Sequence, residues 1–178
     1  MSTATDVWQL SDLPDQAGRT IVVTGTTVGG LGHFTALELA RRGARVVLAG
    51  RSQAKLDETR TAVRSEVPAA ALEQLVVDMS DLASVRQAAA VADRLGPIDV
   101  LVNNAGVMGT PYTRTEDGLE LQMATNHFGP FLLTGLLMPQ LVASGAGRVV
   151  NLASNLHKIA RRAPLGDPRV KQGRYAKW

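Results

Sequence analysis

Short runs of apolar, β-branched residues alternate along the chain with longer segments that have the apolar periodicity of helices. The apolar runs predict five strands, at residues 20–23, 45–49, 75–77, 98–102 and 148–152. The segments between them predict helices at residues 31–42, 52–65 and 82–95, and a long one that begins at Thr115 or Asp117 and reaches about residue 143. Such alternation is typical of right-handed βαβ units. It predicts an α/β fold, a doubly wound parallel sheet with helices on both faces.

A glycine-rich turn, T-G-T-T-V-G-G-L-G at residues 24–32, joins the first predicted strand to the first predicted helix. Glycines at such a turn let main-chain N–H groups approach a pyrophosphate and let the helix pack close to the sheet. The helix N-terminus adds partial positive charge. The turn alone could equally be a bare connection between core elements, so its interpretation depends on the other strand ends.

Polar or glycine residues follow every predicted strand. These are the glycine turn, Gly50-Arg51, Asp78, residues 103–106 and Ser154. In a doubly wound sheet, ligands bind beyond the carboxyl ends of the strands, where the strand order reverses. The sequence therefore predicts a ligand site at this rim of the sheet.

Composition limits the class of protein. The 178 residues are 45% hydrophobic, enough for one sizeable core. No run of about 18 apolar residues predicts a membrane span, and residues 1–18 lack the pattern of a secretory signal. The chain has no cysteine, so we expect neither disulfides nor a thiolate metal site, no bound metal, and a cytoplasmic location.

The net charge of +3 is unevenly distributed. Residues 155–178 hold seven of the 19 basic residues and one of the 16 acidic ones, which leaves 12 basic and 15 acidic residues in the first 154 positions. The basic segment has one Tyr, one Trp and no nucleic-acid motif. We therefore favour a solvated loop over a nucleic-acid partner.

The motifs together resemble the N-terminal two thirds of a short-chain dehydrogenase/reductase, most closely the retinol-dehydrogenase-like and protochlorophyllide-reductase-like members. The resemblance rests on residues 24–32, Asp78, residues 103–106, residues 117–129 and residues 150–154. It implies a Rossmann-like fold and hydride transfer between a nicotinamide cofactor and a small carbonyl or alcohol substrate. It also implies that the whole protein is a homo-oligomer.

The end of the second strand indicates which nicotinamide cofactor is bound. An acid there would accept hydrogen bonds from the ribose 2'-hydroxyl of NAD and repel a 2'-phosphate. This chain has Gly50 and then Arg51, whose planar guanidinium suits phosphate. We therefore expect NADP rather than NAD, although a solvated arginine at a strand end would look the same.

The resemblance implies a set of cofactor-binding residues at the strand ends. They are Gly25, Thr27, Gly29, Gly30, Leu31, Gly32, Arg51, Asp78, Met79, Asn104, Ala105 and Gly106. Asp78 is implied to accept a hydrogen bond from the adenine amine, with a turn-forming role as the alternative. Residues 104–106 could likewise be a simple Asn-Gly turn.

The glycine turn departs from the family spacing G-x-x-x-G-x-G. With Gly25 and Gly29 fixed, the third glycine would fall at Leu31, whereas Gly30 and Gly32 fit if one residue is inserted after Gly25. An added loop residue costs little entropy. We expect a longer loop that still binds phosphate through a set of N–H groups that the sequence leaves open.

The resemblance also implies catalytic roles. Ser154 would hold the substrate oxygen, and Asn126 would hold a water. Pro130 has no N–H, so in a regular helix it would leave the Asn126 carbonyl unpaired and free for that water, unless it marks only a kink.

The tyrosine and lysine that complete the family's site do not match. Tyr175 and Lys177 are two residues apart, so they would not share a helix face and do not form Tyr-x-x-x-Lys. We expect residues 1–154 to form an NADP-binding domain and residues 155–178 a basic segment that leads to a missing catalytic helix. The chain would then be inactive alone. A non-catalytic dinucleotide-binding or redox-sensing module is the alternative.

Overall fold

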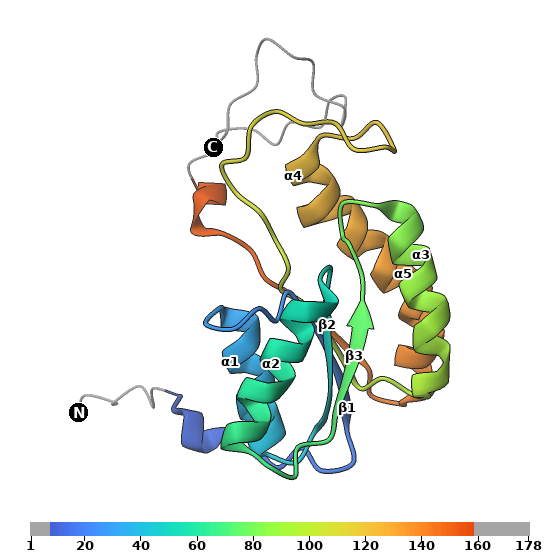
Figure 1. The fold of residues 1–178 in the computed structure, drawn as a ribbon. Helices are drawn as coiled ribbons and strands as arrows, with labels where there is room; N and C mark the ends of the chain where they lie inside the picture. Colours follow the sequence, from blue (N-terminus) through green and yellow to red (C-terminus); the bar gives the residue numbers. More distant parts are fainter. Residues whose placement is uncertain (1–7, 159–178) are drawn as a thin grey trace, which may run out of the picture.

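The computed structural model describes residues 8–158 and contains the predicted parallel sheet (Figure 1). Its five strands are β1 (Thr20–Thr24), β2 (Arg45–Gly50), β3 (Leu72–Val76), β4 (Val100–Asn103) and β5 (Arg148–Asn151). They pair in the order β3-β2-β1-β4-β5, and every pairing is parallel. From β1 the chain runs through β2 to the edge strand β3, and it then crosses back to β4 on the other side of β1. The strand order therefore reverses between β1 and β4, where a ligand site is expected.

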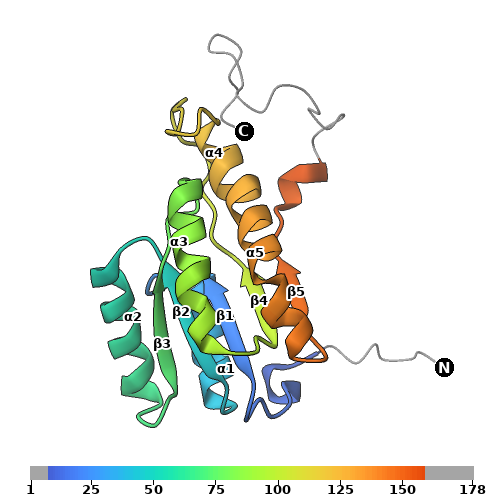
Figure 2. The ribbon, with the colours of Figure 1, turned by 90° about the vertical axis from the view of Figure 1, so that its right-hand side faces the viewer.

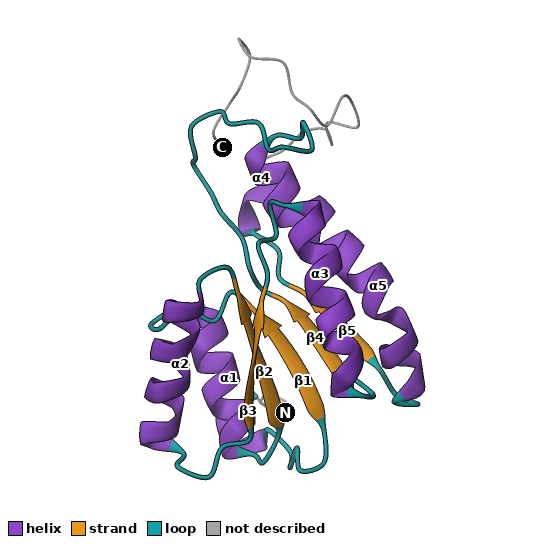
Figure 3. Cartoon of the chain, turned by 45° about the vertical axis from the view of Figure 1, so that its right-hand side comes forward, coloured by secondary structure: helices purple, strands orange, loops and turns teal. Residues whose placement is uncertain are grey.

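Helices cover both faces of the sheet (Figure 3). The main ones are α1 (Leu31–Arg41), α2 (Gln53–Glu66), α3 (Leu82–Ala92) and α5 (Gly129–Ala143). Helices α1 and α2 lie on one face, and α3 and α5 lie on the other. Successive residues of β1 point to opposite faces. Ile21 and Val23 belong to the core cluster between the sheet and α1 and α2, and Val22 belongs to the one between the sheet and α3 and α5. The doubly wound α/β prediction is confirmed.

Of the two edge strands, β3 and β5 (Figure 2), β3 was the harder to place from sequence. We expected the third strand at residues 75–77, but β3 begins at Leu72, because polar Glu73 and Gln74 continue the ladder with β2. Only Leu75 in this strand is fully buried. An edge strand exposes much of its surface, so its apolar signal is short.

The long helix predicted from Thr115 or Asp117 begins later, at Leu121. Residues 115–118 form a turn in which the Gly118 N–H donates to the Thr115 carbonyl, and Gly118 has a φ of 77°. The side chain of Glu120 then accepts hydrogen bonds from the N–H groups of Gln122 and Met123 at the start of α4 (Leu121–Met123). This carboxylate cap, rather than Thr115 or Asp117, begins the helix.

A π-helical turn, Ala124–Phe128, lies between α4 and α5. Within it the Gly129 N–H donates to the Ala124 carbonyl, five residues back. Pro130 follows directly and has no N–H to donate, which favours a local change in the bonding pattern. Gly129 is required here because a Cβ would lie 2.2 Å from the Met79 carbonyl oxygen.

The predictions for the basic segment fall mostly outside the described residues. Only a short 3-10 helix, Asn155–Lys158, belongs to the described part. Tyr175 and Lys177 lie beyond it.

Candidate functional site

The buried hydroxyl of Thr24 joins the loops that follow β1 and β4. Its Oγ1 donates to the Val102 carbonyl at 3.2 Å and accepts from the N–H groups of Asn104 and Ala105, each at 3.0 Å. Thr24 is fully buried. One side chain at the end of the central strand therefore fixes the path of both loops.

Asn104 and the glycines complete this junction. The Asn104 side-chain N–H₂ donates to the carbonyls of Thr24 at 2.7 Å and Gly25 at 3.1 Å. A Cβ at Gly25 would lie 2.8 Å from the Ala105 Cα, and one at Gly32 would lie 2.5 Å from the Gly25 carbonyl oxygen. The loops approach so closely that only glycine fits at these two positions.

This packing supports the interpretation that one residue is inserted after Gly25. Gly32 contacts the Gly25 carbonyl and the Asn104 amide, whereas Leu31 is 63% exposed. Gly30 stands at the N-cap of α1. The glycine that lets the helix approach the sheet is therefore Gly32.

The N–H groups of the glycine loop divide into two sets. Those of Gly25, Gly29 and Gly30 donate to Ala49, to the His33 Nδ1 and to Thr27, respectively. Those of Thr26, Thr27, Val28, Leu31 and Gly32 have no hydrogen-bond partner among residues 8–158. Unpaired amides at a helix N-terminus are what an anion requires.

A pocket of about 610 Å³ opens along the rim beside this loop. Its lining includes most of the predicted cofactor-binding residues, namely Gly25, Thr27, Leu31, Arg51, Asp78, Met79, Asn104, Ala105 and Gly106. Gly29, Gly30 and Gly32 do not line it and instead shape the loop. Whether these residues bind a cofactor stays a prediction.

A smaller pocket of about 100 Å³ lies at the start of α2. It is lined by Thr26, Arg51 and Lys55, among others. Arg51 and Lys55 are exposed, and neither side chain has an ion-pair or hydrogen-bond partner in the described part of the chain. The Thr26 Oγ1 is buried and also has no hydrogen-bond partner there. Two unpaired cations and a buried hydroxyl suit a phosphate.

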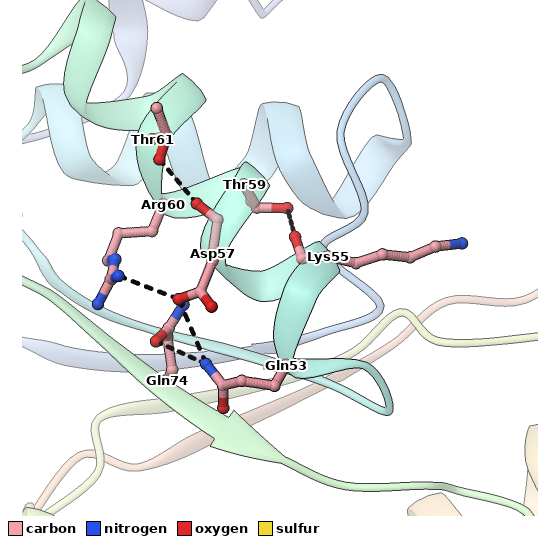
Figure 4. A network of polar contacts seen from close by, with 7 residues as sticks. All are labelled: Gln53, Lys55, Asp57, Thr59, Arg60, Thr61 and Gln74. Carbon is pink, nitrogen blue, oxygen red and sulfur yellow. Dashed lines mark hydrogen bonds and ion pairs between the residues drawn. The ribbon is translucent and has the colours of Figure 1, made fainter.

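Asp57, the first acid after Lys55 on α2, is bonded to other side chains (Figure 4). The Asp57 carboxylate accepts from Gln53 at 3.3 Å, from Gln74 at 3.1 Å and from Arg60 at 3.0 Å. The Lys55 side chain extends away from this network. Our sequence reasoning missed Lys55 and Thr26, although the spacing of four between Arg51 and Lys55 at a helix start was a usable signal.

Asp78 forms the turn that was its alternative role, and it also lines the rim pocket, while its contact with adenine stays a prediction. Its Oδ1 accepts from the Ser80 N–H at 2.8 Å and the Ser80 hydroxyl at 2.7 Å, which is the turn-forming role. Its side chain also lines the 610 Å³ pocket. The turn fixes the carboxylate at the rim.

A second large pocket, of about 820 Å³, brings the predicted catalytic residues together. Asn126 and Ser154 both line it, with His127, Phe131 and Thr134. It shares residues 104–107 with the 610 Å³ pocket, so the two pockets adjoin along this stretch.

Asn126 is held differently from our expectation. Its side-chain oxygen accepts from the Val107 N–H and its N–H₂ donates to the Val107 carbonyl, both at 2.8 Å. The argument for a free Asn126 carbonyl assumed a regular α-helix, and the π-helical turn shows that this assumption is wrong. What the structure shows is a side chain that holds the loop after β4 against the π-helical turn.

Comparison with known proteins identifies the family. The sequence model described as short chain dehydrogenase matches residues 19–163. The chain belongs to this family. Human retinol dehydrogenase 13 is 43% identical over 141 residues, which cover 79% of this chain and 42% of that protein. The resemblance to the retinol-dehydrogenase-like group is confirmed.

Solved structures of family members share the fold. An uncharacterized protein of Mycobacterium paratuberculosis is 42% identical with a TM-score of 0.71, over 84% of this chain and 51% of that one. A 3-oxoacyl (acyl-carrier-protein) reductase of Agrobacterium tumefaciens, solved with NADP bound, is 26% identical with a TM-score of 0.68, over 85% and 58%. The chain spans about half the length of these relatives. It belongs to the short-chain dehydrogenase family by sequence and by fold.

Residues 8–158 contain neither a helix that could span a membrane nor a cluster of metal-ligating side chains. No helix there is long and apolar enough to cross a membrane. No group of three or more His, Asp or Glu side chains there could hold a metal ion.

Proposed function

We propose that this chain is the NADP-binding part of an oxidoreductase that acts on a small carbonyl or alcohol. The observation that carries the proposal is the pair of adjoining pockets at one rim, with unpaired amides and cations at the first and Ser154 with Asn126 at the second. The cofactor would supply or accept the hydride. The protein would bind and orient the cofactor and the substrate, and it would exchange the proton.

Each part of the first pocket fits one part of NADP(H). The amides of Thr27, Leu31 and Gly32 would hold the pyrophosphate, since they have no partner among the described residues. Arg51, Lys55 and the Thr26 hydroxyl would hold the 2'-phosphate. Asp78 and Met79 would lie at the adenine. The NADP-bound reductase with the same fold supports this choice of cofactor.

The second pocket would hold the substrate. Ser154 would donate to the substrate oxygen, and Asn126 would keep the loop after β4 in place through Val107. The substrate would therefore lie against residues 104–107, which form the wall shared by both pockets.

A non-catalytic dinucleotide-binding module remains the second candidate. Within the 178 residues Tyr112 is followed four positions later by Glu116, and Tyr175 lies fewer than four residues before Trp178. Such a module would bind NADP(H) with the same loop and would need no proton donor. Assaying a longer form of the protein for carbonyl reduction would separate the two candidates.

The whole protein's setting is part of the same proposal. We propose a cytoplasmic homo-oligomer, in keeping with the cysteine-free sequence and with the family resemblance. Cell fractionation and light scattering on a longer form of the protein would check both properties.

The choice of NADP over NAD can be tested at Arg51. Replacing Arg51 by alanine is expected to weaken NADPH binding roughly tenfold, because one charge-assisted hydrogen bond contributes about 1.5–3 kcal/mol and this side chain is exposed. NADH binding should change little, since NADH has no 2'-phosphate. Calorimetric titration of both cofactors measures the difference.

Arg64→Ala is the matched control. Like Arg51, Arg64 is an exposed arginine, but it lies on α2 and lines neither pocket. It should leave both affinities within about twofold, as expected for a surface change far from the ligand. Equal affinities for NADPH and NADH in the unsubstituted chain would contradict the cofactor assignment.

A further inference from the structure

The lengthened glycine loop is held at one point by a histidine. His33 lies in the first turn of α1, and its Nδ1 accepts a hydrogen bond from the Gly29 N–H at 3.4 Å. His33 is 8% exposed, and its ring lies 5.2 Å from the ring of Phe34. The contact therefore comes from a side chain whose position is fixed by packing.

The space into which a side chain at Gly29 would extend is open among the described residues. A Cβ at Gly29 would meet no atom within 4 Å, and the neighbouring Val28 is 46% exposed. Gly29 also has a φ of 81°, a conformation that glycine adopts easily but is not forced to keep. Apart from the turn in which the Gly30 N–H donates to the Thr27 carbonyl, the bond to His33 is what fixes this part of the loop.

The chemistry of the ring agrees with a positioning role. Because Nδ1 accepts the Gly29 bond, the ring proton is on Nε2. Nε2 is buried and has no hydrogen-bond partner among the described residues. A buried N–H without a partner is unfavourable, and an apolar side chain of similar size would avoid it. The feature that an apolar side chain could not supply is the acceptor for Gly29.

We infer that His33 is a positioning residue for cofactor binding. By taking the Gly29 N–H, it holds the loop, one residue longer than the family spacing, in the shape that turns the amides of Thr27, Leu31 and Gly32 toward the pyrophosphate. This inference rests on the proposed function. It assigns to one side chain the adjustment that the extra loop residue requires.

Two substitutions separate the acceptor from the packing. His33→Asn keeps an acceptor near the place of Nδ1, whereas His33→Leu keeps a side chain of similar size without an acceptor. Leucine is expected to weaken NADPH binding about three- to tenfold, the effect of losing one ordinary hydrogen bond. Asparagine should restore the affinity to within about twofold, which a purely structural role of the ring would not predict. Melting curves identify any variant that does not fold, and His33→Ala then replaces leucine.

Amide hydrogen exchange tests the contact without a cofactor. The Gly29 N–H should exchange slowly in the unsubstituted chain and in His33→Asn, and rapidly in His33→Leu. Unchanged Gly29 exchange in the leucine variant would overturn the inference. Equal NADPH affinities of the leucine variant and the unsubstituted chain would also overturn it.

A shortened loop gives an independent test. Deleting Val28 restores the spacing G-x-x-x-G-x-G, so the loop should no longer need His33. In that background His33→Leu is expected to change NADPH affinity by less than about twofold. The double-mutant cycle of the Val28 deletion and His33→Leu measures the coupling between the two positions directly. An undiminished effect would show that His33 acts on something other than the added residue.

The proposed function and the inference fail differently. If the unsubstituted chain binds neither NADPH nor NADH, both the function and the positioning role are overturned. If it binds NADPH and the leucine variant binds it equally well, only the role of His33 is overturned.

Discussion

Replacing Thr24 by valine is expected to lower the free energy of unfolding by about 2–4 kcal/mol, although the two side chains have nearly the same shape. The substitution removes the acceptor for the N–H groups of Asn104 and Ala105 and the donor to the Val102 carbonyl. An amide left unsatisfied on burial costs about 1–3 kcal/mol. Asn104 and Ala105 are only half-buried, so some water can replace the lost partner and the total stays below the upper limit.

Thr20→Val is the control for Thr24→Val. Thr20 is the first residue of the same strand and is 8% exposed, but its hydroxyl makes no hydrogen bond among the described residues. Its replacement should change the free energy of unfolding by no more than about 0.5 kcal/mol. Urea denaturation measures both changes. Similar losses for the two variants would show that the Thr24 hydroxyl does not join the loops energetically.

The sequence predicted the sheet and its rim because both depend on local signals. Buried parallel strands are short apolar runs, and the helices between them have clear starts and stops. The glycine turn was interpretable for the same reason. Counting alone indicated that Gly32, not Leu31, would match the third family glycine, and the contacts of Gly32 with Gly25 and Asn104 support that alignment.

Features that depend on contacts between distant residues could not be predicted. The side chain of Asn126 bonds to Val107, 19 residues earlier, and no local pattern indicates this pair. The start of α4 depends on the Glu120 carboxylate, while Thr115 and Asp117 offered more conventional caps. The Asn126 contact is tertiary, whereas the Glu120 cap is local but uses a residue type less preferred at an N-cap than Thr or Asp.

Cofactor preference shows the same division. The sequence pointed to Arg51, since the residue after a strand is readable by position. Whether a neighbouring cation is available to bind the phosphate depends on whether a carboxylate of the protein already pairs with it. Lys55 forms no ion pair in the described part of the chain, and the Asp57 carboxylate is bonded to Gln53, Arg60 and the β3 residue Gln74. Only the structure shows that β3 contributes to this arrangement.

The 178-residue chain, saturated with NADPH, is expected to reduce carbonyl compounds at a rate about 10²–10⁴ lower than a family member that carries Tyr-x-x-x-Lys, because acid–base catalysis is typically worth that factor. Neither Tyr112 nor Tyr175 has a lysine four residues later within this sequence. Ser154 can donate to a substrate oxygen in the 820 Å³ pocket, but a serine hydroxyl alone is a poor proton donor at neutral pH.

The measurement of turnover is the loss of NADPH absorbance with a panel of aldehydes and ketones, beside a longer relative as the positive control. NADPH binding is measured on the same samples, so that a slow reaction is not confused with an empty site. Turnover by the pure chain that Ser154→Ala abolishes would contradict the expectation. It would place the proton donor among the residues of this chain, and the exposed His127, which lines the same pocket, would be the first side chain to replace.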